Sequence, residues 1–219
     1  MITYQEIKNN PTIREYIQRA DESLRALGYT EHSFAHVEKV AVSVEYILMT
    51  LEFSDREIEI GKIAAYMHDI GNLVNRVDHS QSGAIMAFRI LDRMGMNATD
   101  IATIVTAIGN HDEGTGVPVN SIAAALILAD KSDVRRSRVR NHDISTFDIH
   151  DRVNYSATDS QLKISENKKE IQLILTIDTQ YSSVMDYFEI FLGRMVLCRK
   201  AAETLGMKFR LLINNQQLL

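Results

Sequence analysis

The segment Ile122–Ala129 consists of eight consecutive apolar residues, within a region whose pattern predicts a helix over residues 121–133. A helix that is apolar on every side has to be covered on every side, so we expect it at the centre of a helical bundle. The aspartate Asp130 follows this run directly. Because burying a carboxylate is costly unless a cation or strong hydrogen-bond donors face it, Asp130 is a candidate functional residue.

Helical periodicity surrounds this central segment. The chain has two prolines, Pro11 and Pro118, so few positions interrupt a helix. Gly28 and Gly71 are typical of helix ends, and the segment Ser54–Glu57 has the pattern of a capping box. The predicted helices span residues 11–27, 34–51, 54–69, 80–94, 99–110 and 121–133.

The pattern changes after about residue 140, where short runs typical of strands replace helical periodicity. The elements expected there are three strands, a helix and a last strand, over residues 153–155, 161–164, 171–177, 182–205 and 209–213. We therefore expect a mainly α fold, with a helical body over residues 1–145 and a small α+β appendage over residues 146–219.

Composition narrows the class of protein. With 45% hydrophobic and 24% charged residues among 219, the chain can bury a sizeable core. The 24 basic and 29 acidic residues give a net charge of -5, which argues against nucleic acid as a partner. The single cysteine, Cys198, excludes an intrachain disulfide and a cysteine-based zinc site. The chain has no long apolar run and a polar beginning, so we expect a cytoplasmic protein without a membrane span.

Histidines mark the ends of the predicted helices. Of the seven in the chain, His36, His68, His79 and His111 lie at or beside successive helix ends, and Asp69 follows His68 directly. An isolated histidine on an apolar face is more often a core or capping residue than a ligand. Several imidazoles and carboxylates at helix ends are harder to explain in that way, because a bundle gathers such side chains onto one interior point. The spacing favours a site for a divalent metal ion.

The chain resembles the HD-domain superfamily of metal-dependent phosphohydrolases. The resemblance rests on the order of six residues: His36, His68, Asp69, His79, His111 and Asp130. It covers about residues 30–140 and includes the contexts Ala35–Val40, Tyr66–Gly71, His79–Ala84 and Leu128–Asp133. It implies that these six residues hold two divalent ions (iron, manganese, zinc, cobalt or magnesium). It also implies that Asp69 bridges the ions, and that His68 and Asp69 are the catalytic pair.

Similarity to the branch that cleaves cyclic dinucleotides is partial. Asn72 stands where that branch usually has lysine, and the segment His111–Pro118 lacks both its adjacent histidines and its Gly-Tyr-Pro motif. The resemblance therefore does not identify the substrate.

Basic residues near the predicted ligands are candidates for binding substrate phosphate. They are Arg76, Lys131, Arg135 and Arg136. The arginines after residue 134 fit a solvated face or a salt-bridge strip in a homodimer equally well. Three further residues are candidate contacts in the site: His32, Asp112 and Asp133. His142 and His150 are interpreted as surface residues.

The expected function is hydrolysis of a phosphate ester or phosphoanhydride, of a nucleotide type, by a metal-activated water. The expected partner is thus a small-molecule phosphate substrate. Two alternative functions stay open, since the metal ligands alone do not distinguish them from a hydrolase. One is an oxygenase with two irons on the same fold. The other is a nucleotide-binding sensor with little turnover, in which the segment after residue 150 signals to a partner or forms a dimer.

Overall fold

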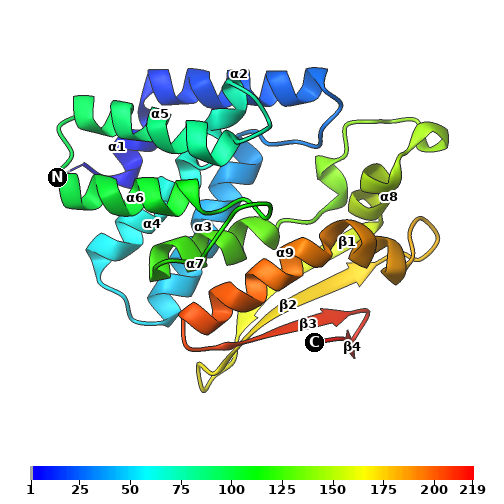
Figure 1. Ribbon diagram of the computed structural model, residues 1–219. Helices are drawn as coiled ribbons and strands as arrows, with labels where there is room; N and C mark the ends of the chain where they lie inside the picture. Colours follow the sequence, from blue (N-terminus) through cyan, green and yellow to red (C-terminus); the bar gives the residue numbers. More distant parts are fainter. Residues whose placement is uncertain (1) are drawn as a thin grey trace.

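The computed structural model describes residues 2–219, in which a helical body precedes a small sheet (Figure 1). The α-helices are α1 (Tyr4–Asn9), α2 (Pro11–Ala26), α3 (Phe34–Thr50), α4 (Asp55–Met67), α5 (His79–Arg93), α6 (Ala98–Gly109), α7 (Ser121–Lys131), α8 (Ile149–Ser156) and α9 (Val184–Thr204). The short 3-10 helices are η1 (Ile70–Leu73), η2 (Arg136–Arg138) and η3 (Ile144–Thr146). The strands are β1 (Ala157–Ile164), β2 (Glu170–Ile177), β3 (Lys208–Ile213) and β4 (Gln216–Gln217). The expected fold class is confirmed.

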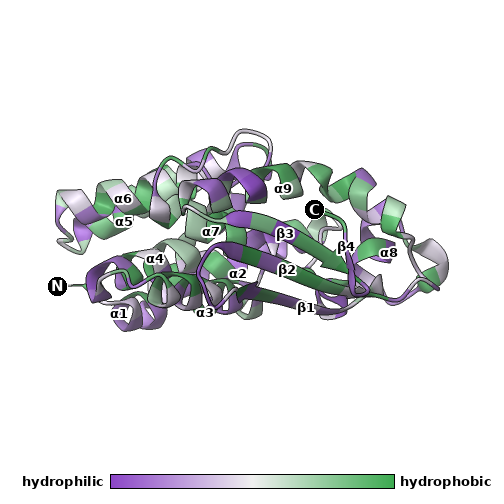
Figure 2. Cartoon of the chain, turned by 90° about the horizontal axis from the view of Figure 1, so that it is seen from below, coloured by the Kyte–Doolittle hydropathy of each residue, from purple (hydrophilic) through white to green (hydrophobic). Residues whose placement is uncertain are grey.

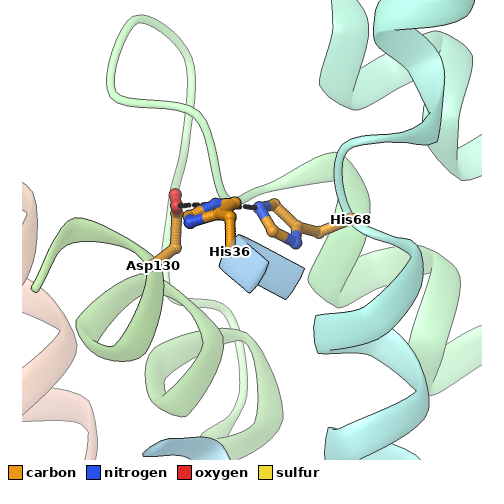
Figure 3. A group of neighbouring side chains, drawn as sticks. All are labelled: His36, His68 and Asp130. Carbon is orange, nitrogen blue, oxygen red and sulfur yellow. Dashed lines mark hydrogen bonds and ion pairs between the residues drawn. The ribbon is translucent and has the colours of Figure 1, made fainter. Parts of the chain in front are cut away.

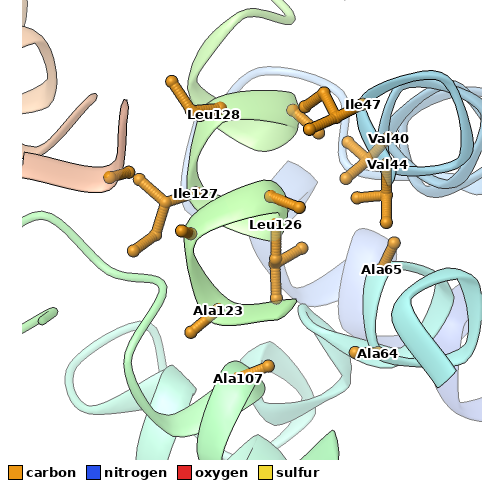
Figure 4. Packing of buried hydrophobic residues seen from close by; sticks show 14 of the residues in the cluster. Val40, Val44, Ile47, Ala64, Ala65, Ala107, Ala123, Leu126, Ile127 and Leu128 are labelled. Carbon is orange, nitrogen blue, oxygen red and sulfur yellow. The ribbon is translucent and has the colours of Figure 1, made fainter. Parts of the chain in front are cut away.

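Helix α7 lies at the centre of the helical body, as its composition predicted. Every side chain from Ile122 to Ala129 is buried, and α3, α4, α6 and α9 pack around the helix. Figure 4 shows Leu126 on the side of α7 that faces Val44 and Ala65 of the neighbouring helices. Removal of this apolar surface from water is the main force that holds the helices together.

Two local signals determine where α4 begins and where the chain turns after it. The Ser54 side chain accepts from the Glu57 amide, and the Glu57 carboxylate accepts from the Ser54 amide at 2.9 Å, so the predicted capping box is confirmed. Beyond α4, Gly71 allows η1 to pack directly on the start of α5. A Cβ atom on Gly71 would lie 1.9 Å from the His79 carbonyl oxygen and 2.4 Å from the Gly83 nitrogen.

One local prediction is wrong, and one helix was not predicted. Residues 153–155, expected as a strand, lie in α8, where the Asp148 side chain caps the helix by accepting from the Asp151 amide at 2.8 Å. Three residues of alternating polarity cannot distinguish a strand from a helix, and the buried side of α8 includes Val153. Helix α1 was not predicted, although Thr3 and Glu6 form a capping box at its start.

The sheet and α9 complete the structure. Strand order is β1-β2-β3-β4: β1 and β2 pair antiparallel, whereas α9 connects β2 to its parallel neighbour β3. Figure 2 shows α9 beside the strands, and the helix contacts both β3 and α7. One hydrophobic core therefore runs through the helical body and the C-terminal segment. Within residues 2–219, no helix combines the length and the apolar character that crossing a membrane requires.

Candidate metal centre

The six residues singled out in the sequence lie around one point beside the C-terminal end of α7. They come from five helix ends: His36 in the first turn of α3, His68 and Asp69 after α4, His79 at the start of α5, His111 after α6, and Asp130 in the last turn of α7. The four histidines and Asp69 are buried, and the Asp130 side chain is 11% exposed. Helix ends thus deliver ligand-type side chains from distant parts of the chain to one interior site.

His36, His68 and Asp130 form the first of two groups (Figure 3). Nε2 of His36 lies 3.3 Å from Nε2 of His68 and 3.2 Å from Oδ1 of Asp130. The distance from Nε2 of His68 to Oδ1 of Asp130 is 3.6 Å. Three ligand atoms that face one another at this spacing could hold one metal ion.

The second group consists of His68, Asp69 and His111, and His79 lies beside His111. Nε2 of His79 is 3.2 Å from Nε2 of His111, and Oδ1 of Asp69 is 3.5 Å and 3.8 Å from these two nitrogens. The other carboxylate oxygen, Oδ2, faces the first group and lies 3.4 Å from Nε2 of His68. Each oxygen of Asp69 therefore faces a different pair of imidazoles.

The outward-facing nitrogens show which ring atoms carry protons. Nδ1 of each histidine has an acceptor outside the centre: Ala65 O for His68 (2.7 Å), Arg76 O for His79 (3.0 Å), Ile108 O for His111 (2.6 Å) and Asp133 Oδ2 for His36 (2.8 Å). A carbonyl or carboxylate oxygen only accepts, so in a neutral ring Nδ1 donates and Nε2 keeps its lone pair. In their neutral form the four rings thus direct their Nε2 lone pairs, together with two carboxylates, into one site, a donor set that fits divalent cations.

Asp133 anchors the His36 ring from behind. Its side chain is 1% exposed and also receives Lys39 Nζ and Arg135 Nε, each at 2.9 Å. Burial alone would raise the pKa of Asp133, but the hydrogen bond from His36 and the nearby positive charges, that of Arg138 foremost, hold the pKa well below its usual range. The ionised Asp133 side chain therefore fixes the orientation of His36.

The pKa values of two histidines of the centre, His79 and His68, shift in opposite directions, and those of its two carboxylates are lowered. Burial, together with the charges of nearby groups, lowers the pKa of His79 to about 4. Burial opposes ionisation of Asp69 and Asp130, but His68 beside the first and Lys131 beside the second hold both pKa values well below the usual range. In His68 burial likewise lowers the pKa, but the two carboxylates outweigh it and raise the pKa overall.

A cavity of about 460 Å³ opens onto this centre. Its walls include four of the six residues and four basic side chains: Asp69, His79, His111, Asp130, Arg76, Lys131, Arg138 and Arg194. The structure thus places two of the predicted phosphate-binding residues, Arg76 and Lys131, at the cavity.

Arg135 and Arg136 do not line the cavity. Arg135 pairs with Glu31 at 2.9 Å as well as with Asp133, which makes it part of the support behind His36. Arg136 donates from Nε to the Tyr155 carbonyl at 2.6 Å and lies over that residue's ring. The direction of these side chains depends on contacts that the local sequence does not reveal.

Four further residues line the cavity or approach the centre. Two of them, Arg194 and His150, lie outside the region of the HD-domain resemblance. Arg194 comes from α9, and His150, interpreted as a surface residue, is exposed but lines the cavity from α8. His32 also lines the cavity, and its ring packs edge-on against His36 at 5.5 Å. Asp112 lies 3.9 Å from Nε2 of His79. His150 and Arg194 carried no local signal, because they reach the site only through the packing of the C-terminal segment.

Comparison with known proteins gives distant similarity. No protein-family model matches the chain. An uncharacterized protein of Methanocaldococcus jannaschii is 26% identical, over 79% of this chain and 76% of that protein. The crystal structure of a predicted HD superfamily hydrolase from an uncultured Thermotogales bacterium is 22% identical with a TM-score of 0.44, and the match covers 62% of this chain and 75% of that chain.

Proposed function

We propose that this chain is an HD-type metal-dependent phosphohydrolase that holds two divalent ions and acts on a small phosphate ester or phosphoanhydride of a nucleotide type. The observation that carries the proposal is the position of Asp69, whose two oxygens face separate pairs of imidazole Nε2 atoms. A carboxylate in that position is suited to bridge two ions, with His36, His68 and Asp130 on one side and His79 and His111 on the other.

Divalent ions in such a centre supply an activated water at neutral pH and offset the negative charge of a phosphoryl group. The chain's own residues provide the remaining requirements. Hydrogen bonds at Nδ1 hold the four rings so that Nε2 points inward, which spares the centre the cost of reorganising when ions bind. His68 and Asp69 lie where the two groups meet, the position at which we place the attack on phosphorus.

Arg76 is the best placed side chain for a substrate phosphate. It lines the cavity, and its guanidinium contacts the neutral groups Asn72 Oδ1 and His79 Nε2, each at 3.3 Å. Its guanidinium carbon also lies 5.7 Å from the centre of the Tyr29 ring, so the contacts of this charge are with neutral groups and it can pair with an anion. Tyr29 is 44% exposed at the cavity wall, so a nucleobase that stacks against its ring would lie beside Arg76.

The test starts with metal content, measured by elemental analysis on protein purified anaerobically without chelators or a histidine tag. We expect about two ions per chain and, after reconstitution with Mn²⁺, release of phosphate from a panel that includes p-nitrophenyl phosphate and nucleotides. The Asp69→Asn variant should lose both ions and activity, whereas Asp92→Asn, an exposed position on α5, should keep them.

Three results would contradict the proposal. Fewer than one ion that reconstitution does not restore would remove the metal centre. Tight nucleotide binding with negligible turnover in the loaded protein would indicate a sensor. Two irons with substrate-dependent oxygen consumption, and no anaerobic hydrolysis with Mn²⁺, would indicate an oxygenase.

A further inference from the structure

Lys131 connects the candidate ligand Asp130 to the C-terminal helix α9 through a continuous series of ion pairs. Its Nζ lies 2.8 Å from Oδ2 of Asp130 and 2.7 Å from Oε2 of Glu113. The other oxygen of Glu113, Oε1, accepts a hydrogen bond from Nε of Arg194 at 2.9 Å. Four side chains from α7, the loop after α6 and α9 thus alternate in charge, and the series ends at a candidate ligand.

The contact with Lys131 sets the orientation of the Asp130 carboxylate. Oδ1 of Asp130 faces Nε2 of His36 and His68, whereas Oδ2 faces the ammonium group. Because the two oxygens have different partners, the carboxylate cannot rotate without losing one of them. Side chains that contact a metal ligand from the side away from the metal set the orientation of that ligand and hence the metal affinity of the site.

Lys131 needs a second carboxylate to remain in this place. Its side chain is 6% exposed, and a buried ammonium beside divalent cations is costly unless anions balance it. Glu113 supplies that anion while lying between two cations itself. Burial would raise the pKa of Glu113, but the charges of Lys131 and Arg194 outweigh it and hold the pKa well below its usual range.

The packing of α9 determines the position of Arg194. The guanidinium carbon lies 4.3 Å from the centre of the Phe191 ring, one turn earlier on the helix. Phe191 is itself 1% exposed and belongs to the core in which α9 packs against α7. The end of the series is therefore fixed by an element outside the region of the HD-domain resemblance.

We propose that Arg194 and Glu113 are positioning residues of the metal centre, which hold Lys131 against Asp130 and so keep its Oδ1 directed at the first ion-binding group. This inference rests on the proposed function, because it requires that the centre bind metal. It gives α9 a defined part in the site: the C-terminal segment stabilises one ligand of one ion.

The effect should be confined to one of the two groups. Asp130 belongs with His36 and His68, and the ion pairs of the series reach the centre at Oδ2 of Asp130. Loss of Arg194 should therefore weaken one ion-binding site and leave the other as it is.

The experiment titrates Mn²⁺ into the full-length metal-free chain by calorimetry, in the wild type and the variants Arg194→Ala and Arg194→Lys. The matched control is Arg56→Ala. Arg56 pairs with Asp100 through Nε at 3.0 Å with a side chain 23% exposed, against 24% for Arg194. Arg56 lies at the start of α4, whereas the ligands lie beyond its end, so its loss should destabilise the fold without moving Asp130.

We expect Arg194→Ala to lower Mn²⁺ affinity at one site by about 10- to 100-fold, with Arg194→Lys retaining most of it and Arg56→Ala binding as the wild type does. If Arg194→Ala fails to fold, Glu113→Gln should give the same one-site loss. Equal affinities in all variants, or equal weakening of both sites, would overturn the inference. The proposed function would stand in that case, provided that the wild type binds two ions. A wild type that binds no Mn²⁺ would overturn the proposed function and the inference with it.

Discussion

Replacement of Gly71 by alanine tests whether the close approach of η1 to α5 assembles the centre. The added methyl group would lie 1.9 Å from the His79 carbonyl oxygen and 2.4 Å from the Gly83 nitrogen, both of them backbone atoms. Since Cβ contacts shorter than 3.0 Å essentially do not occur, η1 and the start of α5 have to separate by at least about 1.1 Å. Asp69 precedes η1 and His79 begins α5, so the displacement falls between two candidate ligands.

The magnitude follows from the rigidity of both obstructing atoms. Overpacking costs about 1–3 kcal/mol where side chains can adjust, and backbone obstruction places this variant at the upper end, near 3 kcal/mol. For a chain of this size that loss lowers Tm by roughly 6–12 °C. A shift of about 1 Å between reacting groups also costs on the order of 100-fold in rate, so Mn²⁺ affinity and turnover should fall with stability.

The assay is thermal unfolding of the metal-free chain followed by Mn²⁺ titration, with Gly193→Ala as the control. Gly193 is exposed on α9, and a Cβ there meets no atom within 4 Å. Alanine is the better helix former by about 1 kcal/mol, so this variant should be slightly more stable than the wild type. If Gly71→Ala unfolds within about 2 °C of the wild type and still binds two ions, the proposed role of this contact is wrong.

Three further outcomes follow from ionisable groups in the structure. Asp133→Asn should lower Mn²⁺ affinity about 10- to 100-fold. The pKa of Asp133 is lowered in the folded chain, so the stabilisation from its charge is complete above about pH 4 and is lost as pH falls further. The difference in stability between the wild type and Asp133→Asn, measured by urea unfolding, should therefore shrink in acid. Burial lowers the pKa of His79 from 6.5 to about 4. The free energy of unfolding of the metal-free wild type should therefore fall by about 3 kcal/mol relative to that of His79→Gln as pH falls from 6.5 to 4. A difference that stays constant over this range would contradict the assigned burial. Burial raises the pKa of the Cys198 thiol to about 12, so a disulfide reagent at pH 8 should leave it unmodified in the folded chain and react once urea unfolds it; rapid reaction of the folded chain would show that α9 opens.

Features that depend on neighbouring residues could be predicted from the sequence. The apolar run before Asp130 required a central helix, and α7 is one. The capping box at Ser54 and the periodicity of the helical body gave element positions to within a few residues, because hydrogen bonds within a helix and the spacing of its apolar side chains are local properties. For the same reason, the placement of histidines at helix ends could be read before their contacts were known.

Only the tertiary structure decided which side chains meet. Asp133 lies 97 residues from His36 in the sequence, and Arg194 lies 81 residues from Glu113, yet these pairs support the centre. Nothing local distinguishes Arg76 from Arg136, but one faces the cavity and the other lies over a tyrosine ring. Such contacts depend on how helices pack, and packing is set by the shapes of many side chains distant in sequence. The sequence therefore determined most helices of the body and the candidate ligands, whereas tertiary packing decided the surroundings of these ligands, their charge partners and the walls of the cavity.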